Sequence, residues 1–276
     1  MKALLLHEPA IRLGFFFGVF ALMALWEILA PRRPLTVSRP WRWANNLGIV
    51  FLNTALVRVI FPTSAVALAI TAESQGWGLL YYLAVLIAVV ALDLIIYLQH
   101  VLFHAVPALW RLHRLHHADL DYDLTTGARF HPVEILLSML IKFAAILVLG
   151  PPAVAVLIFE VVLNAMAMFN HGNVRLPLGL DRVLRLLVVT PDMHRVHHSI
   201  EDHETNSNFG FNLSLWYRVF GTYKDQPDAG HTGMTIGIRD FRNEQEVDRL
   251  PGMLALPFRG QVTDYAINRR SWGKKK

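Results

Sequence analysis

Long apolar segments are the feature that most restricts the fold of this chain. Five of them occur, at about residues 10–30, 43–71, 79–104, 135–149 and 152–170. A helix needs about 20 apolar residues to cross a bilayer, and inside lipid every backbone polar group must be satisfied within the helix itself. Only 17% of the residues are charged, whereas a soluble domain has about a quarter. These segments predict an all-α, polytopic membrane bundle and disfavour a soluble protein with a large core.

The first three segments are long enough to span the membrane, and the last two are separated by Gly150-Pro151-Pro152, which predicts a turn. Segment 135–149 would form about 22 Å of helix, which is short of a hydrocarbon core of about 30 Å. This pair should be a helical hairpin that either crosses the membrane or dips in and returns. Within the second segment, Arg58 should face the bundle, with a structural partner favoured over a lipid headgroup or substrate. Pro62 should kink that helix.

The distribution of arginine predicts the orientation of the bundle. Residues 31–42 contain four arginines, whereas loops 72–78 and 150–152 contain neither lysine nor arginine. Cytoplasmic loops are enriched in both residues, so 31–42 should be cytoplasmic, together with a polar, helical cap formed by 105–134 and 172–276. The net charge of +5 is explained in the same way, without nucleic-acid binding. We expect a single domain over residues 1–276, in a bacterial inner membrane.

Histidines gather in three clusters in or beside this cap. One has the spacing H-x-x-x-H and two have the spacing H-x-x-H-H; the members are His100 and His104, then His113, His116 and His117, then His194, His197 and His198. Each spacing places the side chains on one face of a helix. Pro107 and Thr190-Pro191 are typical helix starts ahead of the second and third clusters. The chain has no cysteine, which excludes Cys-bound zinc and iron–sulfur clusters.

Eight clustered histidines, with His171 between the second and third clusters, indicate a metal centre better than they indicate core packing. Neutral imidazole is a common ligand of zinc, iron, copper and nickel. A structural zinc ion takes four protein ligands, so nine candidates suit two metal ions. Asp93 lies on the predicted helix face of His100 and His104. It should either orient a ligating histidine as a hydrogen-bond acceptor or pair with Arg58.

These motifs, in this order, resemble the three histidine boxes of the fatty acid hydroxylase and sterol desaturase superfamily. Flanking residues resemble that superfamily as well; they are His117-Ala118-Asp119, Arg129-Phe130-His131-Pro132-x-Glu134, Phe169-Asn170-His171, Thr190-Pro191-Asp192-Met193-His194, Asn208-Phe209-Gly210 and Phe220-Gly221-Thr222-Tyr223. The likeness covers roughly residues 80–225, and its flanks look most like the sterol-desaturase branch. Tyr217 departs from the pattern, because the family usually has Asp there, and this puts a C-terminal polar contact in doubt.

The resemblance implies a di-iron centre that uses O2 to hydroxylate or desaturate a C–H bond of a lipid. It implies nine metal ligands, which are His100, His104, His113, His116, His117, His171, His194, His197 and His198. His131 would be either a further ligand or a residue that supports one. Four residues are candidates to orient ligands through their second ring nitrogen; they are Asp93, Glu134, Glu160 and Asn164.

An oxygenase of this kind needs electrons, and the chain has no cysteine for an iron–sulfur site and no Gly-rich dinucleotide motif after a strand. A separate electron-donor protein is therefore implied. Four arginines are predicted either to form its docking surface or to bind lipid headgroups; they are Arg111, Arg114, Arg195 and Arg218.

Three other classes of protein use clustered histidines. A zinc-dependent membrane hydrolase needs a general base beside its metal, as in H-E-x-x-H, which this chain lacks. A metal transporter should have ligands near the membrane midplane, and a bis-histidine haem protein would leave most of these histidines unused. These classes are therefore disfavoured, and the chain is predicted to be the membrane di-iron lipid oxidoreductase that the resemblance implies. Its residues do not separate fatty acyl, sterol, carotenoid or alkylglycerol substrates, nor hydroxylation from desaturation or ether cleavage.

Overall fold

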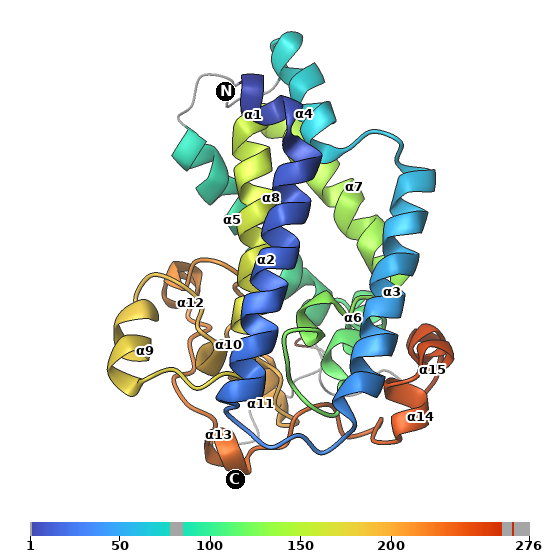
Figure 1. The fold of residues 1–276 in the computed structure, drawn as a ribbon, viewed down its shortest axis with the longest axis vertical. Coiled ribbons are helices and arrows are strands. Elements are labelled where there is room, and N and C mark those ends of the chain that lie inside the picture. The colour runs from blue at the N-terminus through green and yellow to red at the C-terminus, as the bar shows by residue number, and fades with distance from the viewer. Residues whose placement is uncertain (1, 78–84, 261–266, 268–276) are drawn as a thin grey trace.

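The computed structural model describes residues 2–77, 85–260 and 267, and this part of the chain is helical, with isolated β-bridges and no β-strand. Within these described residues, five stretches are long and apolar enough to cross a membrane; they are Glu8–Leu29, Arg39–Ser74, Val85–Ala105, Pro132–Leu149 and Ala153–Asn170. Their helices run along the long axis of the molecule in Figure 1. The predicted all-α membrane bundle is confirmed. Residues 79–84 of the third predicted span lie outside the described residues.

The bundle is built around α8 (Ala153–Asn170), which contacts α2 (Glu8–Leu29), α4 (Ala65–Ser74) and α5 (Val85–Ala105). A short helix, α1 (Lys2–Leu6), precedes α2 and also contacts α8. The predicted hairpin is present, because α7 (Pro132–Leu149) and α8 are joined by a short turn. Gly150 ends α7 in the left-handed conformation at φ 60°, which a residue without a Cβ adopts at little cost.

The second predicted span is broken rather than kinked. Helix α3 (Arg39–Ile60) ends two residues before Pro62, and α4 begins at Ala65 with Ser64 as its N-cap. Proline has no N–H for the helix and forces the residue before it out of the helical conformation. The prediction that Arg58 faces the bundle is wrong, since its side chain is exposed. Because Arg58 lies in the last turn of α3, its long side chain can extend from the helix end toward polar surroundings.

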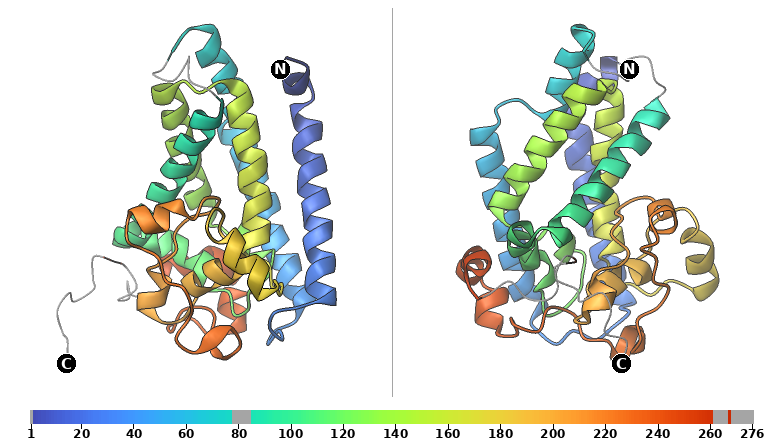
Figure 2. Two further views of the ribbon diagram at one scale, coloured as in Figure 1. Left: turned by 90° about the vertical axis from the view of Figure 1, so that its left-hand side faces the viewer. Right: turned by 180° about the vertical axis from the view of Figure 1, so that it is seen from behind.

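The remaining helices are short and gather at the end of the bundle where α2 ends and α3 begins (Figures 1 and 2). They are α6 (Pro107–His117), η1 (Thr126–Ala128), α9 (Leu178–Leu184), α10 (Pro191–His197), α11 (Asp202–Thr205), α12 (Leu215–Val219), α13 (Gly230–Gly233), α14 (Glu244–Val247), α15 (Leu250–Ala255) and η2 (Leu256–Phe258). The predicted helix starts at Pro107 and Pro191 are confirmed. Thr190 caps α10 by accepting a hydrogen bond from the Met193 N–H at 3.4 Å.

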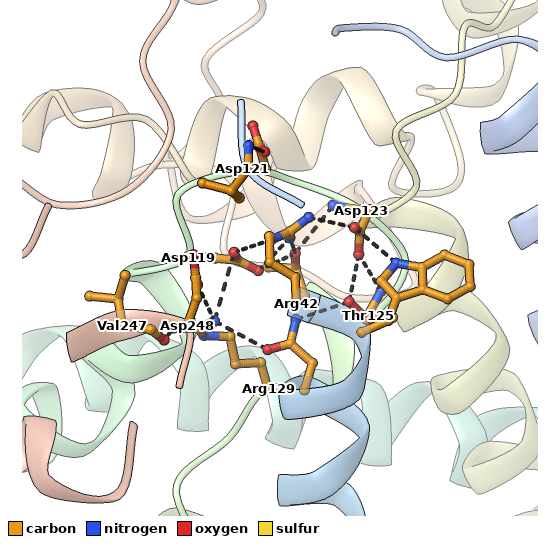
Figure 3. Close-up of polar contacts among 12 residues, drawn as sticks. Arg42, Asp119, Asp121, Asp123, Thr125, Arg129, Val247 and Asp248 are labelled. Carbon is orange, nitrogen blue, oxygen red and sulfur yellow. Dashed lines mark hydrogen bonds and ion pairs between the residues drawn. The ribbon is translucent and has the colours of Figure 1, made fainter. Parts of the chain in front are cut away.

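A buried ionic network fastens the cap to the bundle (Figure 3). Arg42 of α3 donates from Nε and Nη2 to both carboxylate oxygens of Asp119, each at 2.8 Å, and from Nη1 to Asp123 at 2.6 Å. Arg129 donates to Asp248 at 2.9 Å and so ties the same loop to the C-terminal segment. Burial alone would raise the pKa of Asp119, but Arg42 and Arg129 hold that pKa well below its ordinary value. The loop after α6 is therefore fixed by buried ion pairs that join it to α3 and to the C-terminal segment.

Candidate metal centre

The structure brings all nine predicted histidines together, and every one is buried. They come from α5, α6, the C-terminal end of α8 and α10, so the bundle and the cap both contribute. One group of five consists of His100, His104, His113, His117 and His197. A second group of four consists of His116, His171, His194 and His198. Within each group, one ring nitrogen of each member lies within 4.8 Å of those of the others, which is close enough for one metal ion per group.

Hydrogen bonds at the opposite ring nitrogens determine which tautomers the first group adopts. His100 Nδ1 lies 2.6 Å from the carbonyl oxygen of Phe209, and His197 Nδ1 lies 2.7 Å from that of Ser207. A carbonyl oxygen only accepts, so both Nδ1 atoms must carry the proton. The two Nε2 atoms are then unprotonated, and yet they lie 3.1 Å apart. Two lone pairs facing each other at this distance repel unless a cation lies between them.

Other members of this group repeat the arrangement. His113 Nδ1 lies 2.6 Å from Glu134 Oε1, and its Nε2 lies 2.9 Å from His100 Nε2. His104 Nδ1 faces Asn206 Oδ1 at 3.2 Å, while its Nε2 lies 3.1 Å from His117 Nε2. Two nitrogen ligands about 2.1 Å from one metal ion and at right angles to each other would lie about 3.0 Å apart. The spacing of the Nε2 atoms therefore fits a shared metal ion.

The second group shows the same geometry with fewer supporting contacts. His171 Nδ1 donates to the carbonyl oxygen of Ala167 at 2.7 Å, and its Nε2 lies 3.2 Å from His116 Nε2 and 3.1 Å from His194 Nε2. Neither ring nitrogen of His198 has a hydrogen-bond partner among the described residues, although both are buried. Unsatisfied buried nitrogens are costly, and metal coordination would satisfy one of the two in His198.

Burial sets the protonation state of the cap histidines. It lowers the pKa of His171 to about 3. Burial, reinforced by neighbouring imidazoles, also lowers the pKa of six others well below 6.5; these are His113, His116, His117, His194, His197 and His198. Seven histidines are therefore neutral at neutral pH, which is the form that binds metals.

Glu134 is the one predicted supporting residue that contacts a histidine of either group. Its Oε1 accepts from His113 Nδ1, as described above, while its Oε2 has no hydrogen-bond partner among the described residues. His131 instead caps α7, where its Nδ1 accepts from the Val133 N–H at 3.2 Å. Its Nε2 lies 3.2 Å from the carbonyl oxygen of Leu254. With both nitrogens occupied and no place in either group, His131 is structural.

The other three predicted supporting residues lie too far along their helices. Asp93 accepts from the Trp216 indole at 2.8 Å and from the Leu213 N–H at 3.3 Å, rather than pairing with a histidine or Arg58. Glu160 pairs with Lys142 at 2.7 Å and with Arg12 at 2.5 Å inside the bundle. Asn164 is exposed and donates to the Glu160 carbonyl one turn earlier.

The predictions for Asp93, Glu160 and Asn164 were wrong because residues that share a helix face can still be far apart. A residue seven or eleven positions from a histidine lies about 10 or 16 Å from it along the helix axis.

The predicted arginine docking surface is largely wrong, because Arg114 and Arg195 are buried. Arg114 donates to the Leu256 carbonyl at 2.7 Å, and Arg195 pairs with Asp192 and lies over the Tyr122 ring. Arg111 is half-buried and donates to the Pro257 carbonyl. Only Arg218 is exposed, and it donates to the carbonyls of Ser214 and Arg185.

Three phenylalanines beside the histidines were not predicted to be site residues, although two of them lie in the motif flanks. Phe130 stacks on His116 with ring centroids 4.6 Å apart, and Phe209 is buried against His100 and His104. Phe211 is half-buried and lies 5.1 Å from His100 in the first group and 5.8 Å from His194 in the second. Tyr217, the departure from the family pattern, is buried and donates to the Gly210 carbonyl at 3.0 Å.

Comparison with known proteins identifies the family of this chain. The family model described as fatty acid hydroxylase matches residues 85–222, which hold all nine histidines. Ornithine lipid hydroxylase OlsE of Rhizobium tropici is 27% identical over 232 residues, covering 80% of this chain and 69% of that protein. Alkylglycerol monooxygenase of Homo sapiens is 30% identical over 155 residues, covering 56% of this chain and 34% of that protein. The chain thus matches about a third of the length of that relative. No solved structure matches this chain.

Proposed function

This chain belongs to the fatty acid hydroxylase family, and we propose that it is a membrane-embedded di-iron oxidoreductase that uses O2 to hydroxylate an alkyl chain of a membrane lipid. The observation that carries this proposal is the convergence of Nε2 atoms within two histidine groups, where fixed acceptors hold the Nδ1 protons of His100, His197 and His171 and leave their Nε2 atoms unprotonated. Bound iron would supply the activation of O2 for attack on an unactivated C–H bond, which no side chain of the chain supplies.

The protein's own part in this reaction is to hold and shield the site. The nine histidines would be the ligands, five for one iron and four for the other. Backbone carbonyls and Glu134 fix the ring orientations through Nδ1. Residues 1–276 would act as one domain, because Arg42 of α3 and Asp248 near the C-terminal end both bind the loop that follows the second histidine cluster. Burial of all nine histidines limits access of bulk water.

A lipid with a polar headgroup and a long alkyl chain is the substrate class that the relatives favour. The hydroxylase of Rhizobium tropici, named for ornithine lipid, matches most of this chain, whereas the alkylglycerol monooxygenase matches little more than half. Hydroxylation is therefore proposed ahead of ether cleavage. The alkyl chain would enter from the bilayer, because α5 and α8 carry histidines at their cap ends and are membrane-spanning helices.

Orientation and electron supply complete the proposal. The four arginines in 31–42 support a cytoplasmic cap, and a relative from Rhizobium supports a bacterial inner membrane. A separate donor protein would deliver electrons to the cap, since the chain has no cysteine to hold an iron–sulfur cluster. Its docking surface cannot rest on Arg114 or Arg195, which are buried.

The proposal is tested by metal analysis followed by a lipid assay. Protein purified in detergent and reconstituted with iron should hold two iron ions per chain. With O2 and a reductant or reductase it should add a hydroxyl group to ornithine lipids or glycerolipids, detected as a mass increase of one oxygen atom in the product. A single tightly held zinc ion that iron does not replace, together with no oxygen insertion into any lipid, would refute it.

Glu134 offers a graded test of ligand orientation. We expect Glu134→Ala to lower metal affinity or activity by about 10–100-fold, because His113 Nδ1 loses its acceptor. Glu134→Gln keeps an acceptor oxygen and should lose less. Chelator competition measures the affinity, and Asn164→Ala, which removes an exposed amide, is the control. Equal affinities for all three variants would contradict the role.

Phe211 should decide which carbon of the alkyl chain is oxidised. Its ring contacts histidines of both groups and also packs against the apolar core formed by α4, α5, α7 and α8. It therefore lies between the metal centre and the membrane bundle. Truncation in Phe211→Ala removes an apolar contact worth about 1–3 kcal/mol in discrimination, so the hydroxyl position should spread over several carbons while metal content stays unchanged.

Product mapping by mass spectrometry of fragmented lipids measures this effect. Phe209→Ala is the matched control, because Phe209 is buried in the cap and packs with Tyr97 and Met193. That variant should lose metal or fold poorly without a selective change in position. An unaltered product distribution in Phe211→Ala would show that another residue positions the chain.

A further inference from the structure

An exposed apolar surface lies on the cap outside the predicted spans. It is formed by α9, by Leu186 and Leu187 shortly after α9, and by α12 with its C-cap residue Phe220. Its members and their exposed fractions are Leu178 (72%), Leu180 (47%), Val183 (63%), Leu186 (62%), Leu187 (71%), Leu215 (48%), Val219 (59%) and Phe220 (48%). We call this set the α9–α12 surface. Apolar clusters of this kind on a soluble face usually mark an interaction site.

The position of this surface relative to the spans indicates what covers it. Figure 1 shows α12 at a level along the long axis well above the lower end of α2, and α9 at the level of the last turns of α2, and the views of Figure 2 show the same levels. Helix α2 is long and apolar enough to span the membrane up to Leu29, and the loop after it is tied to the cap, because Arg32 pairs with Asp192 and Arg33 donates to the carbonyls of His231 and Met234. The α9–α12 surface therefore lies at a depth where α2 itself is surrounded by hydrocarbon, and it continues the lipid-facing side of the bundle.

The inward face of α9 is built for attachment to the protein. Asp181 and Arg185 are buried and pair with each other, with Nε and Oδ2 at 2.8 Å. Arg185 also donates to the Tyr223 hydroxyl at 3.2 Å. Asp181 and the C-cap residue Arg185 thus point into the cap, whereas Leu178, Leu180 and Val183 point outward, together with the exposed Arg182.

Charge at the edge of this surface matches a bilayer that contains anionic lipid. Arg175, Arg182 and Arg218 are all exposed. Arginine can bury its apolar stem beside lipid chains while its guanidinium reaches a phosphate. An acidic protein partner would also match the arginines, but it would not explain an apolar surface at the depth of the spans.

We propose that the α9–α12 surface is inserted in the membrane leaflet on the cap side, with Arg175 and Arg182 bound to anionic phospholipid headgroups. It does not cross the bilayer. The inserted surface contacts α5, the helix that carries His100. Phe220 stacks on Tyr97 of α5 with ring centroids 5.2 Å apart, and the Tyr97 hydroxyl lies 2.9 Å from Thr222 Oγ1. Tyr97 precedes His100 by one turn. The proposal adds a membrane-inserted surface to the polar cap that was expected for residues 172–276.

The absence of cysteine allows a direct test with single spin-labelled cysteines in the full chain reconstituted into vesicles. Leu186→Cys and Val219→Cys report on the surface. Leu22→Cys on α2, with the same 62% exposure as Leu186, is the lipid control, and Asp240→Cys, at an exposed cap residue, is the water control. Collision rates of each label with O2, which concentrates in lipid, and with a water-soluble nickel chelate are then compared.

Labels at Leu186 and Val219 should give an oxygen-to-nickel ratio close to that of Leu22 and severalfold above that of Asp240. A ratio like that of Asp240 would overturn the proposal and would favour a soluble partner protein, since the vesicles contain this chain alone. Circular dichroism and the Leu22 ratio, measured in parallel with the other labels, confirm that each protein is folded and inserted. The outcome is independent of whether the proposed oxygenase activity is found.

The proposed binding of Arg182 to anionic phospholipid headgroups is tested with Arg182→Glu. In the unsubstituted background, adding phosphatidylglycerol to phosphatidylcholine vesicles should lower the nickel collision rate at Leu186, and the Arg182→Glu background should lose most of this effect. If lipid charge has the same effect in both backgrounds, Arg182 does not bind headgroups.

Discussion

Replacing one histidine in each group should remove one metal ion at a time. In His197→Ala the first group loses a proposed ligand whose Nε2 lies 3.1 Å from that of His100. In His198→Ala the second group loses a proposed ligand whose ring nitrogens have no hydrogen-bond partner among the described residues. Each variant should retain about one iron ion of two, since the other group is intact, and each should lose oxygenase activity completely because the proposed chemistry uses both ions.

His131→Ala is the control for this experiment, because His131 belongs to the same motif region but to neither group. It should keep both iron ions and most of its activity, with a loss of helix-cap stability of about 0.5–2 kcal/mol. Metal analysis by mass spectrometry and oxygen consumption give the two readouts. Loss of both ions in His197→Ala and retention of both in His198→Ala would show that the two groups are not two separate sites.

Much of this site could be predicted from the sequence because the spacing of the histidines within one helix determines which side chains share a face. H-x-x-x-H and H-x-x-H-H place ring nitrogens on one face of a helix, and the structure does place His100 with His104 and His113 with His117 in one group. The sequence could not predict the division between groups. His116 and His117 are adjacent and enter different groups, since consecutive residues on a helix point about 100° apart.

The wrong predictions concern residues whose contacts or burial depend on segments distant in the sequence. Arg114 and Arg195 look like surface charges because the carbonyl of Leu256 that accepts from Arg114 is far away in the sequence, and because nothing local shows that the Arg195–Asp192 pair is buried. Glu160 shares a helix face with His171, but a face does not set depth, and Lys142 and Arg12 pair with it instead. The break at Pro62 could be anticipated as a disturbance, but its size depends on how α3 and α4 pack.

Arg42 should be the most sensitive residue outside the histidines. Arg42→Met would leave Asp119 and Asp123 buried with one cationic partner fewer, and breaking a buried ion pair in this way costs about 3–5 kcal/mol. The loop that these aspartates anchor follows His117 directly and leads through Arg129 to Glu134. We therefore expect a large fall in the thermal unfolding temperature in detergent and a parallel loss of bound iron.

Arg58→Met is the matched control, because it is the same substitution on the same helix at an exposed position; its unfolding temperature should change little. Adding Asp119→Asn to Arg42→Met should recover part of the lost stability, since the double variant removes one of the two carboxylate charges that lost Arg42 and leaves Arg129 to the remaining ones. If Arg42→Met unfolds at the same temperature as Arg58→Met, the cap is held by its apolar core, in which Trp110, Leu115 and Ile49 of α3 pack together. Recovery in the double variant would instead show that the ion pair between Arg42 of α3 and Asp119 of the cap stabilises the loop that follows the second histidine cluster.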